Sequence, residues 1–171
     1  MSLKLVQYIT LLAATVTTGL IAGLFFSFTT AVMPALGRSS DRTFVETMNN
    51  INVTILNGWF LSCFMGALVF SLLAVLTHLP RGGRSVLPWL IAGFVLYLSV
   101  IVITGAINVP LNNDLAKTSA TDPVAALTAA RTHFQSTWVR WNTVRTLASI
   151  AAFGCLVGAL FTHARSTVTG S

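Results

Sequence analysis

Charged residues are scarce in this chain of 171 residues, since only 8% are Asp, Glu, Lys or Arg while 54% are hydrophobic. Soluble domains carry about a quarter charged residues, so the composition excludes an ordinary soluble domain. Residues 5–37, 47–80, 85–113 and 146–164 hold no charged side chain at all. A helix needs about 20 apolar residues to cross the hydrocarbon of a bilayer, and each of these stretches can supply one crossing.

The apolar stretches also lack the alternating pattern of barrel strands, which leaves helices as the spanning structure. The sequence therefore predicts an all-α fold, an integral membrane four-helix bundle with spans over about 6–36, 52–78, 86–109 and 139–163. Residues 1–165 are expected to form one domain and 166–171 a mobile tail. The first stretch exceeds the roughly 7–15-residue core of a signal peptide, so a retained helix is expected. Pro110 is expected to end the third span because it lacks an amide donor.

Two short interfacial helices are expected in the longer connections. The first begins at residue 40 or 41 and places apolar residues at helical spacing. The second begins at Asp122 and Pro123, which are typical of a helix cap and first position, and carries Arg131 and His133. Because the number of spans is even, both helices lie on the face opposite the termini.

The face with the termini lacks acidic residues. Its basic residues are Lys4, Arg81, Arg84 and Arg165. The other face holds all four acids of the chain and at least as many basic residues. In line with the positive-inside tendency, we expect the plasma (inner) membrane, with both termini in the cytoplasm.

Cysteine and histidine are rare. Cys63 and Cys155 fall in different predicted spans, where they are expected to pack as small apolar residues, although a disulfide between them is conceivable. His78 and His163 end spans on the terminal face; they could meet, but separate termination at the interface is favoured. His133 lies across the membrane, so the sequence predicts no metal site.

Familiar nucleotide-binding, hydrolase and haem-attachment motifs are missing, and no basic arm or aromatic platform indicates nucleic acid as a partner. Gly19, Gly23 and Ser27 recur at four-residue spacing and form a small-residue ridge. Such a ridge lets another helix approach closely. The neighbour is a helix of the same bundle or of a second copy, so a homo-oligomer is one expectation.

Polar residues concentrate toward the long-loop face. Trp138, Trp141, Asn142, Arg145 and Ser149 share one stripe of the fourth helix, by their helical spacing. That stripe is expected to face the bundle interior at the mouth of a ligand pocket. The tryptophans could instead form an interfacial aromatic belt. Asparagines at the same end, among them Asn57, Asn108 and Asn112, could instead cross-link helices.

Arg145 lies about two helical turns inside the membrane from Trp138, where a lone charge is costly. It therefore needs a partner or a wet cavity, and Glu46 or Asp114 is the expected partner. The alternative is an arginine that snorkels to the interface.

Four segments together resemble the anthrone oxygenase-like family of integral membrane proteins, also known as DUF1772. They read FFSFTTAVMPAL, FVETMNNIN, INVPLNNDL and WVRWNTVRTLASIAAF, in the order of the four spans. The most specific parts are NVPLN at residues 108–112 and the W-x-x-W-N-x-x-R run at residues 138–145. The resemblance covers nearly the whole chain and implies the predicted fold.

The resemblance also implies an activity, the oxidation of an anthrone methylene to an anthraquinone by O₂ without a classical redox cofactor. Such a site needs aromatic walls, an oxyanion stabiliser and a base. Candidate substrate-binding residues are Trp138, Trp141, Asn142, Asn57, Asn112, Phe25 and Phe28. Candidate catalytic residues are Arg145 with Asn108 for the oxyanion, and His133 or Asp114 as the base.

A second function class fits the same residues, a non-enzymatic membrane module that binds a lipophilic ligand or a protein partner. The convergent Asn, Trp and Arg side chains favour a site of some kind, whereas the lack of a deep acid and base pair favours the binding module. Expected partners in either case are membrane lipids and a hydrophobic small molecule. A transporter has little support because four spans without inverted repeats or broken midplane helices would have to oligomerise to form a path.

Overall fold

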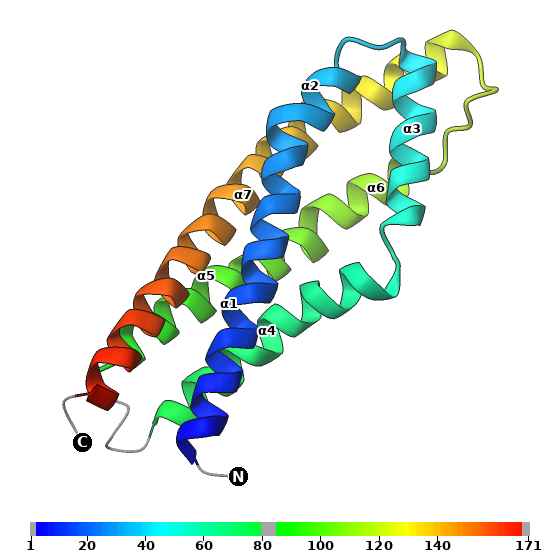
Figure 1. Cartoon of the computed structure of the whole chain (residues 1–171). Coiled ribbons are helices and arrows are strands. Elements are labelled where there is room, and N and C mark those ends of the chain that lie inside the picture. The colour runs from blue at the N-terminus through cyan, green and yellow to red at the C-terminus, as the bar shows by residue number, and fades with distance from the viewer. Residues whose placement is uncertain (1–2, 80–84, 169–171) are drawn as a thin grey trace.

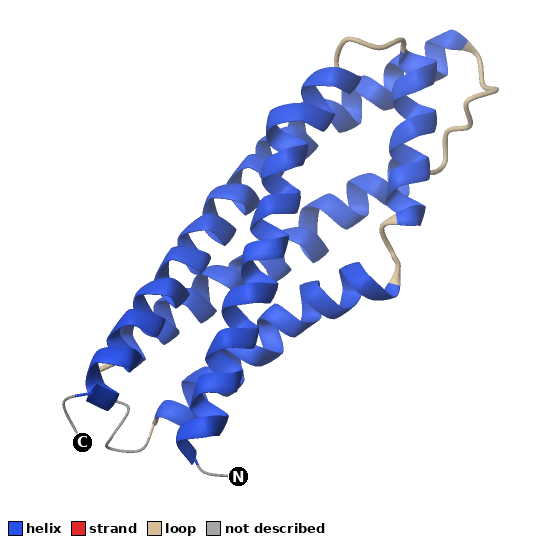
Figure 2. Cartoon of the chain, viewed as in Figure 1, coloured by secondary structure: helices blue, strands red, loops and turns tan. Residues whose placement is uncertain are grey.

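The computed structural model describes residues 3–79 and 85–168, and every element in these ranges is a helix (Figure 2). In chain order they are α1 (Leu3–Ser27), η1 (Phe28–Val32), α2 (Met33–Leu36), α3 (Asp41–Thr54), α4 (Gly58–His78), α5 (Leu87–Ile103), η3 (Thr104–Asn108), α6 (Val109–Leu115) and α7 (Val124–Val168). The two η segments are π-helices, in which the backbone bonds to the fifth residue along instead of the fourth.

Four of the described helical rods are long and apolar enough to cross a membrane: Leu3–Leu36, Gly58–His78, Leu87–Leu115 and Val124–Arg165. The start of α1 and the end of α7 lie at one end of the bundle, which we call the terminal end (Figure 1). The loop between α2 and α3 and the start of α7 lie at the opposite end, which we call the loop end. The prediction of an all-α, multi-pass membrane bundle is confirmed.

The core has three parts along the bundle. At the terminal end, Leu11, Leu90 and Leu156 are fully buried together. A middle cluster contains Phe25 and Tyr97, and the tyrosine hydroxyl donates to the carbonyl of Phe64 at 2.8 Å. At the loop end α3 packs on α7 through an aromatic cluster around Phe44, Phe134 and Trp138. Clusters from different helices therefore hold the rods together along their whole length.

The fourth helix differs from the prediction. It begins at Val124, not near residue 139, so the second expected loop helix is the first part of α7. Residues 124–139 contain neither proline nor glycine, and nothing in that stretch interrupts a helix. The first loop helix is present as α3, with the Ser40 hydroxyl accepting from the amide of Thr43 at 3.2 Å.

The prediction that Pro110 ends the third span is wrong, because the helical rod continues to Leu115. The π-helix η3 ends two residues before Pro110, and η1 ends two residues before Pro34. Proline has no amide hydrogen, and its ring crowds the carbonyl four residues earlier. The wider π turn absorbs this defect locally, so each rod passes its proline without ending.

The remaining expectations concern small residues and chain ends. A Cβ on Gly19 would lie 2.9 Å from the Phe153 ring, so this part of the glycine ridge packs on α7, whereas one on Gly23 would meet nothing within 4 Å. Helix α7 extends to Val168, into the segment expected as a tail, and residues 169–171 lie outside the described residues. The connection with Arg81 and Arg84 also lies outside them.

Candidate functional site

Arg145 of α7 lies inside the bundle with only 4% of its surface exposed. Its Nη2 donates to Asn142 Oδ1 at 2.9 Å, and its Nη1 donates to Thr104 Oγ1 at 3.1 Å. Its Nε is buried and has no hydrogen-bond partner within the described chain. The guanidinium therefore donates to two neutral oxygens, and its Nε–H group remains unused among the described residues.

Aromatic rings enclose the same guanidinium. Its central carbon lies 4.4 Å from the ring centroid of Phe25 and 5.4 Å from that of Trp138. At these distances the faces of the rings attract a cation. Phe28 extends this wall, with its ring centroid 5.8 Å from that of Trp138. Two predicted wall residues, Phe25 and Trp138, thus contact Arg145, Phe28 packs behind Trp138, and the side chain of Trp141 is half-buried on the same helix.

Asn142 is held in one orientation by the first span. Its Nδ2 donates to Thr29 Oγ1 at 2.9 Å and to the Phe25 carbonyl at 3.2 Å. Because both contacts require the amide nitrogen to face the first span, the amide oxygen must face Arg145. Thr29 is also 2.9 Å from the hydroxyl of Thr146.

Both π-helices contribute to this cluster. Thr29 belongs to η1, while Thr104 and Asn108 are the first and last residues of η3. Widened helical turns of this kind are frequent at functional sites because they redirect side chains from the regular helical face. Sequence reasoning missed both threonines, although Pro34 and Pro110 could have signalled the irregular turns.

Asn108 joins the two most specific sequence motifs. It is 1% exposed, and its Nδ2 lies 3.5 Å from the Trp138 carbonyl. The Trp138 indole in turn donates to Asn112 Oδ1 at 2.8 Å. The Oδ1 of Asn108 is buried without a partner in the described residues. The site therefore holds an unused acceptor as well as the unused Nε–H donor of Arg145.

The predicted ion pair of Arg145 is wrong for the part of the chain described. Asp114 pairs with Lys117 at 2.7 Å, and Glu46 is exposed on α3. Asp114 lies on α6, six residues after Asn108 in the chain. The snorkelling alternative does not describe Arg145 either, since its polar contacts lie within the bundle.

Other predicted site residues lie away from this cluster. Asn57 is exposed and caps α4, its Oδ1 accepting from the amide of Phe60 at 3.0 Å. His133 is exposed on α7, close enough to Asp114 to interact electrostatically. Neither of the predicted bases, His133 and Asp114, has a contact with Arg145. The site as described therefore contains no base beside the guanidinium.

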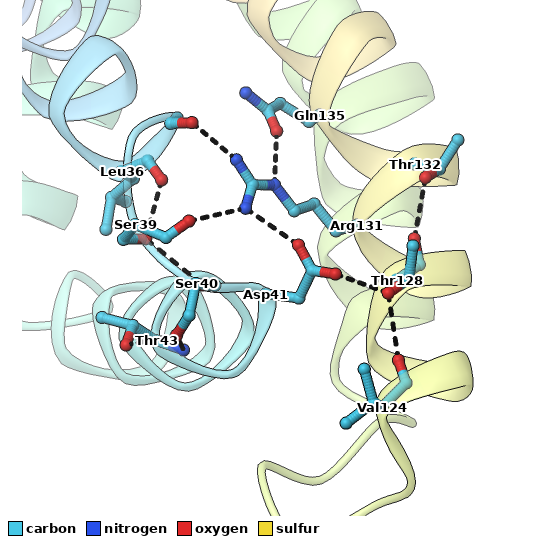
Figure 3. A network of polar contacts seen from close by, with 11 residues as sticks. Leu36, Ser39, Ser40, Asp41, Thr43, Val124, Thr128, Arg131, Thr132 and Gln135 are labelled. Carbon is cyan, nitrogen blue, oxygen red and sulfur yellow. Dashed lines mark hydrogen bonds and ion pairs between the residues drawn. The ribbon is translucent and has the colours of Figure 1, made fainter.

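A second arginine of α7, Arg131, ties the loop after α2 to the helix (Figure 3). Its guanidinium donates to the carbonyls of Gly37 and Ser39 at 2.8 and 2.9 Å, and to Asp41 Oδ1 at 2.9 Å. A hydrogen bond from Thr128 and the charge of Arg131 hold the pKa of the Asp41 carboxyl below its usual value, despite partial desolvation. A pocket of about 480 Å³ opens beside Asp41 and Arg131, and Arg145 is not part of its lining.

The histidines of the terminal end meet, contrary to the favoured expectation. His78 Nδ1 donates to the Ala74 carbonyl at 2.7 Å, which leaves Nε2 as the acceptor for His163 Nδ1 at 3.3 Å. Both rings are buried. Cys63 and Cys155 are free thiols. The described residues contain no group of three or more His, Cys, Asp or Glu side chains that could hold a metal ion.

Comparison with known proteins agrees with these observations. Residues 59–155 match the model of the anthrone oxygenase family, and this segment contains Asn108, Trp138, Asn142 and Arg145. No curated protein and no solved structure matches the chain. Because the family match covers more than half of its length, the chain belongs to the anthrone oxygenase family.

Proposed function

We propose that this membrane protein is an oxygenase that oxidises an anthrone-type or other hydrophobic aromatic substrate with O₂, and that Arg145 stabilises the substrate oxyanion. The observation that carries the proposal is a buried guanidinium without a carboxylate partner among the described residues. Membership of the anthrone oxygenase family supports the reaction class.

The electrostatics of the cluster favour an anionic ligand. Removing a cation from water is expensive unless an opposite charge or good hydrogen bonds compensate it. Thr104, Asn142 and two aromatic faces supply partial compensation. An anionic oxygen beside Nε would supply the rest. The free Oδ1 of Asn108 can accept from a hydroxyl of the same ligand.

The proposed reaction balances with substrate and O₂ alone. The anthrone loses a proton and becomes an electron-rich phenolate, which transfers electrons to O₂ and forms a carbon–oxygen bond at the former methylene. Loss of the second hydrogen and cleavage of the O–O bond give the quinone carbonyl and one water. One oxygen atom of O₂ thus enters the product, and the other leaves as water.

We propose that the guanidinium acts in the first of these steps. A fixed positive charge in a poorly hydrated site lowers the proton affinity of a bound enol. Because His133 and Asp114 have no contact with Arg145, we infer that this charge, with water or hydroxide as the proton acceptor, replaces a dedicated base at the cluster.

The test is oxidation of emodin anthrone by the protein purified in detergent under air. Quinone absorbance and O₂ uptake are followed for the wild type, Arg145→Met and Arg140→Met. Arg140 is exposed on the same helix and provides the matched control. We expect the wild type and Arg140→Met to accelerate the reaction and Arg145→Met to lose the acceleration. Retained activity in Arg145→Met at an unchanged melting temperature would place the site elsewhere.

A second candidate function rests on the absence of a base at Arg145, namely binding of a lipophilic anion without turnover. Quenching of tryptophan fluorescence by emodin anthrone distinguishes it, because Trp138 contacts the guanidinium. Saturable quenching that depends on Arg145, without acceleration of oxidation, would favour the binding module.

For location, we propose the plasma (inner) membrane with the termini in the cytoplasm. The basic residues of the terminal end, without acids in its described part, support this orientation. Reporter fusions at residue 171 that are active only in the cytoplasm would agree with it, and periplasmic activity would reverse it.

A further inference from the structure

The terminal end of the bundle has a pocket that takes no part in the proposed reaction. Its volume is about 400 Å³, and the start of α1 and the end of α7 form its walls. The lining residues are Lys4, Leu5, Tyr8, Leu160, His163 and Ala164. In Figure 1 these helix ends lie at the opposite end of the molecule from α3.

Charge around this pocket has one sign. Lys4 is the charged residue of its lining, and Arg165 directly follows Ala164 in the chain. The acids of the chain all belong to the loop end: Asp41 and Glu46 on α3, Asp114 on α6, and Asp122 before α7. No Asp or Glu side chain therefore opposes an anion bound beside Lys4.

The walls are suited to an amphiphile rather than a free ion. Leu5 and Leu160 provide apolar surface, and Tyr8 is 50% exposed, with a ring and a hydroxyl that suit the boundary between hydrocarbon and head groups. A lysine at the boundary between hydrocarbon and head groups extends its charged end toward the head groups, while its aliphatic stem covers apolar surface. The lining thus offers an apolar wall and a cationic rim.

Buried hydrogen bonds hold the inner wall in place. His163, which lines the pocket, is linked to His78, and His78 is linked to the Ala74 carbonyl of α4. Gln7 of α1 donates to the Thr77 carbonyl at 2.8 Å. Helices α1, α4 and α7 are therefore cross-linked beneath the pocket, and a ligand does not have to order this wall on binding.

We propose that this pocket binds an anionic phospholipid, with the phosphate at Lys4 and the upper acyl chain along Leu5 and Leu160. Phosphate and a single positive side chain near a membrane surface attract each other by about 1 kcal/mol, or roughly fivefold in affinity. The site goes beyond the proposed oxygenase and does not depend on it, because it lies at the other end of the bundle.

The test is lipid retention by the full chain in a neutral detergent, measured by native mass spectrometry with phosphatidylglycerol, phosphatidylcholine and oleate. Lys4→Gln is compared with Lys117→Gln, which removes the same charge at the loop end, where the side chain is 75% exposed. We expect several-fold preference of the wild type for phosphatidylglycerol over phosphatidylcholine. Lys4→Gln should reduce phosphatidylglycerol retention about fivefold, and Lys117→Gln should leave it unchanged.

Each other outcome contradicts the proposal. Equal retention of the two phospholipids would show that the head-group charge is not recognised. Equal losses in both lysine variants would indicate attraction to net charge alone. Oleate bound as tightly as phosphatidylglycerol would assign the pocket to a carboxylate amphiphile. Because Lys4 is exposed, its replacement leaves the buried core intact, and an unchanged melting temperature checks this.

Discussion

Arg131 and Arg145 lie on the same helix and have opposite surroundings. Arg131 uses its donors on two backbone carbonyls, a glutamine and the Asp41 carboxylate. Arg145 is more deeply buried, yet its described partners are neutral, and its Nε has none. A satisfied arginine stabilises a fold, whereas an incompletely satisfied buried arginine is poised for a ligand. We therefore propose that Arg131 stabilises the fold and that Arg145 acts on a ligand.

The largest expected effect is the loss of catalysis in Arg145→Met. Removing one donor from an oxyanion site costs about 100- to 1,000-fold in rate. We therefore expect the oxidation rate of emodin anthrone to fall by about 100-fold or more, as measured by quinone absorbance. Arg145→Lys keeps the charge but loses the planar donors, and we expect an intermediate rate. Equal rates for the wild type, Arg145→Met and Arg145→Lys would show that Arg145 takes no part in the reaction.

The second effect is a loss of stability in Arg131→Met. This change removes the guanidinium that donates hydrogen bonds to the carbonyls of Gly37 and Ser39 and to the carboxylate of Asp41. The expected cost is about 2 kcal/mol, measured as a lower unfolding midpoint in detergent. Activity per folded molecule should stay near the wild-type value. A variant that is stable but inactive would instead connect Arg131 to the site.

A third change converts the surroundings of Arg145 into those of Arg131. Asn142→Asp places a carboxylate where the amide oxygen accepts from Nη2. The internal ion pair should compete with an anionic ligand and weaken its binding by about tenfold, seen in tryptophan quenching. Asn142→Leu is the control, because it removes the hydrogen bond without adding charge. Binding by Asn142→Asp that equals or exceeds that of Asn142→Leu would show that the ligand is not held by charge.

Much of the loop-end site was predictable because helical spacing determines which residues share a face. The stripe that contains Trp138, Asn142 and Arg145 does face the interior, and the asparagines of the NVPLN motif do contact Trp138. Spacing within one helix does not determine which residues of a neighbouring helix lie opposite that face. Spacing therefore did not reveal Thr104, and it did not reveal that Asp114 pairs with Lys117 and not with Arg145.

Other errors have a different physical origin. The sequence predicts that Pro110 ends its helix, but the π turns before Pro34 and Pro110 allow both rods to continue. The meeting of His78 with His163 depends on how α4 and α7 converge, which their separate sequences do not specify. Long uncharged stretches thus predicted the spans, whereas the irregular turns and the contacts between helices depend on how the folded chain packs.

The smallest expected effect is a pH dependence at the Arg131 network. The pKa of Asp41 in the folded protein lies below the ordinary value of 3.8, first because of the Thr128 hydrogen bond and then because of Arg131. A depressed carboxyl pKa adds stability above the unfolded-state pKa, and this contribution disappears as the pH falls through the folded-state pKa. The melting temperatures of the wild type and Asp41→Asn should therefore differ by a constant amount above about pH 5 and converge below about pH 4.

Glu46→Gln, which replaces an exposed acid on the same helix, is the control and should follow the wild-type curve. A constant gap down to pH 3 would mean that the Asp41 carboxylate does not stabilise the loop after α2, and that Arg131 is satisfied by its backbone carbonyls alone.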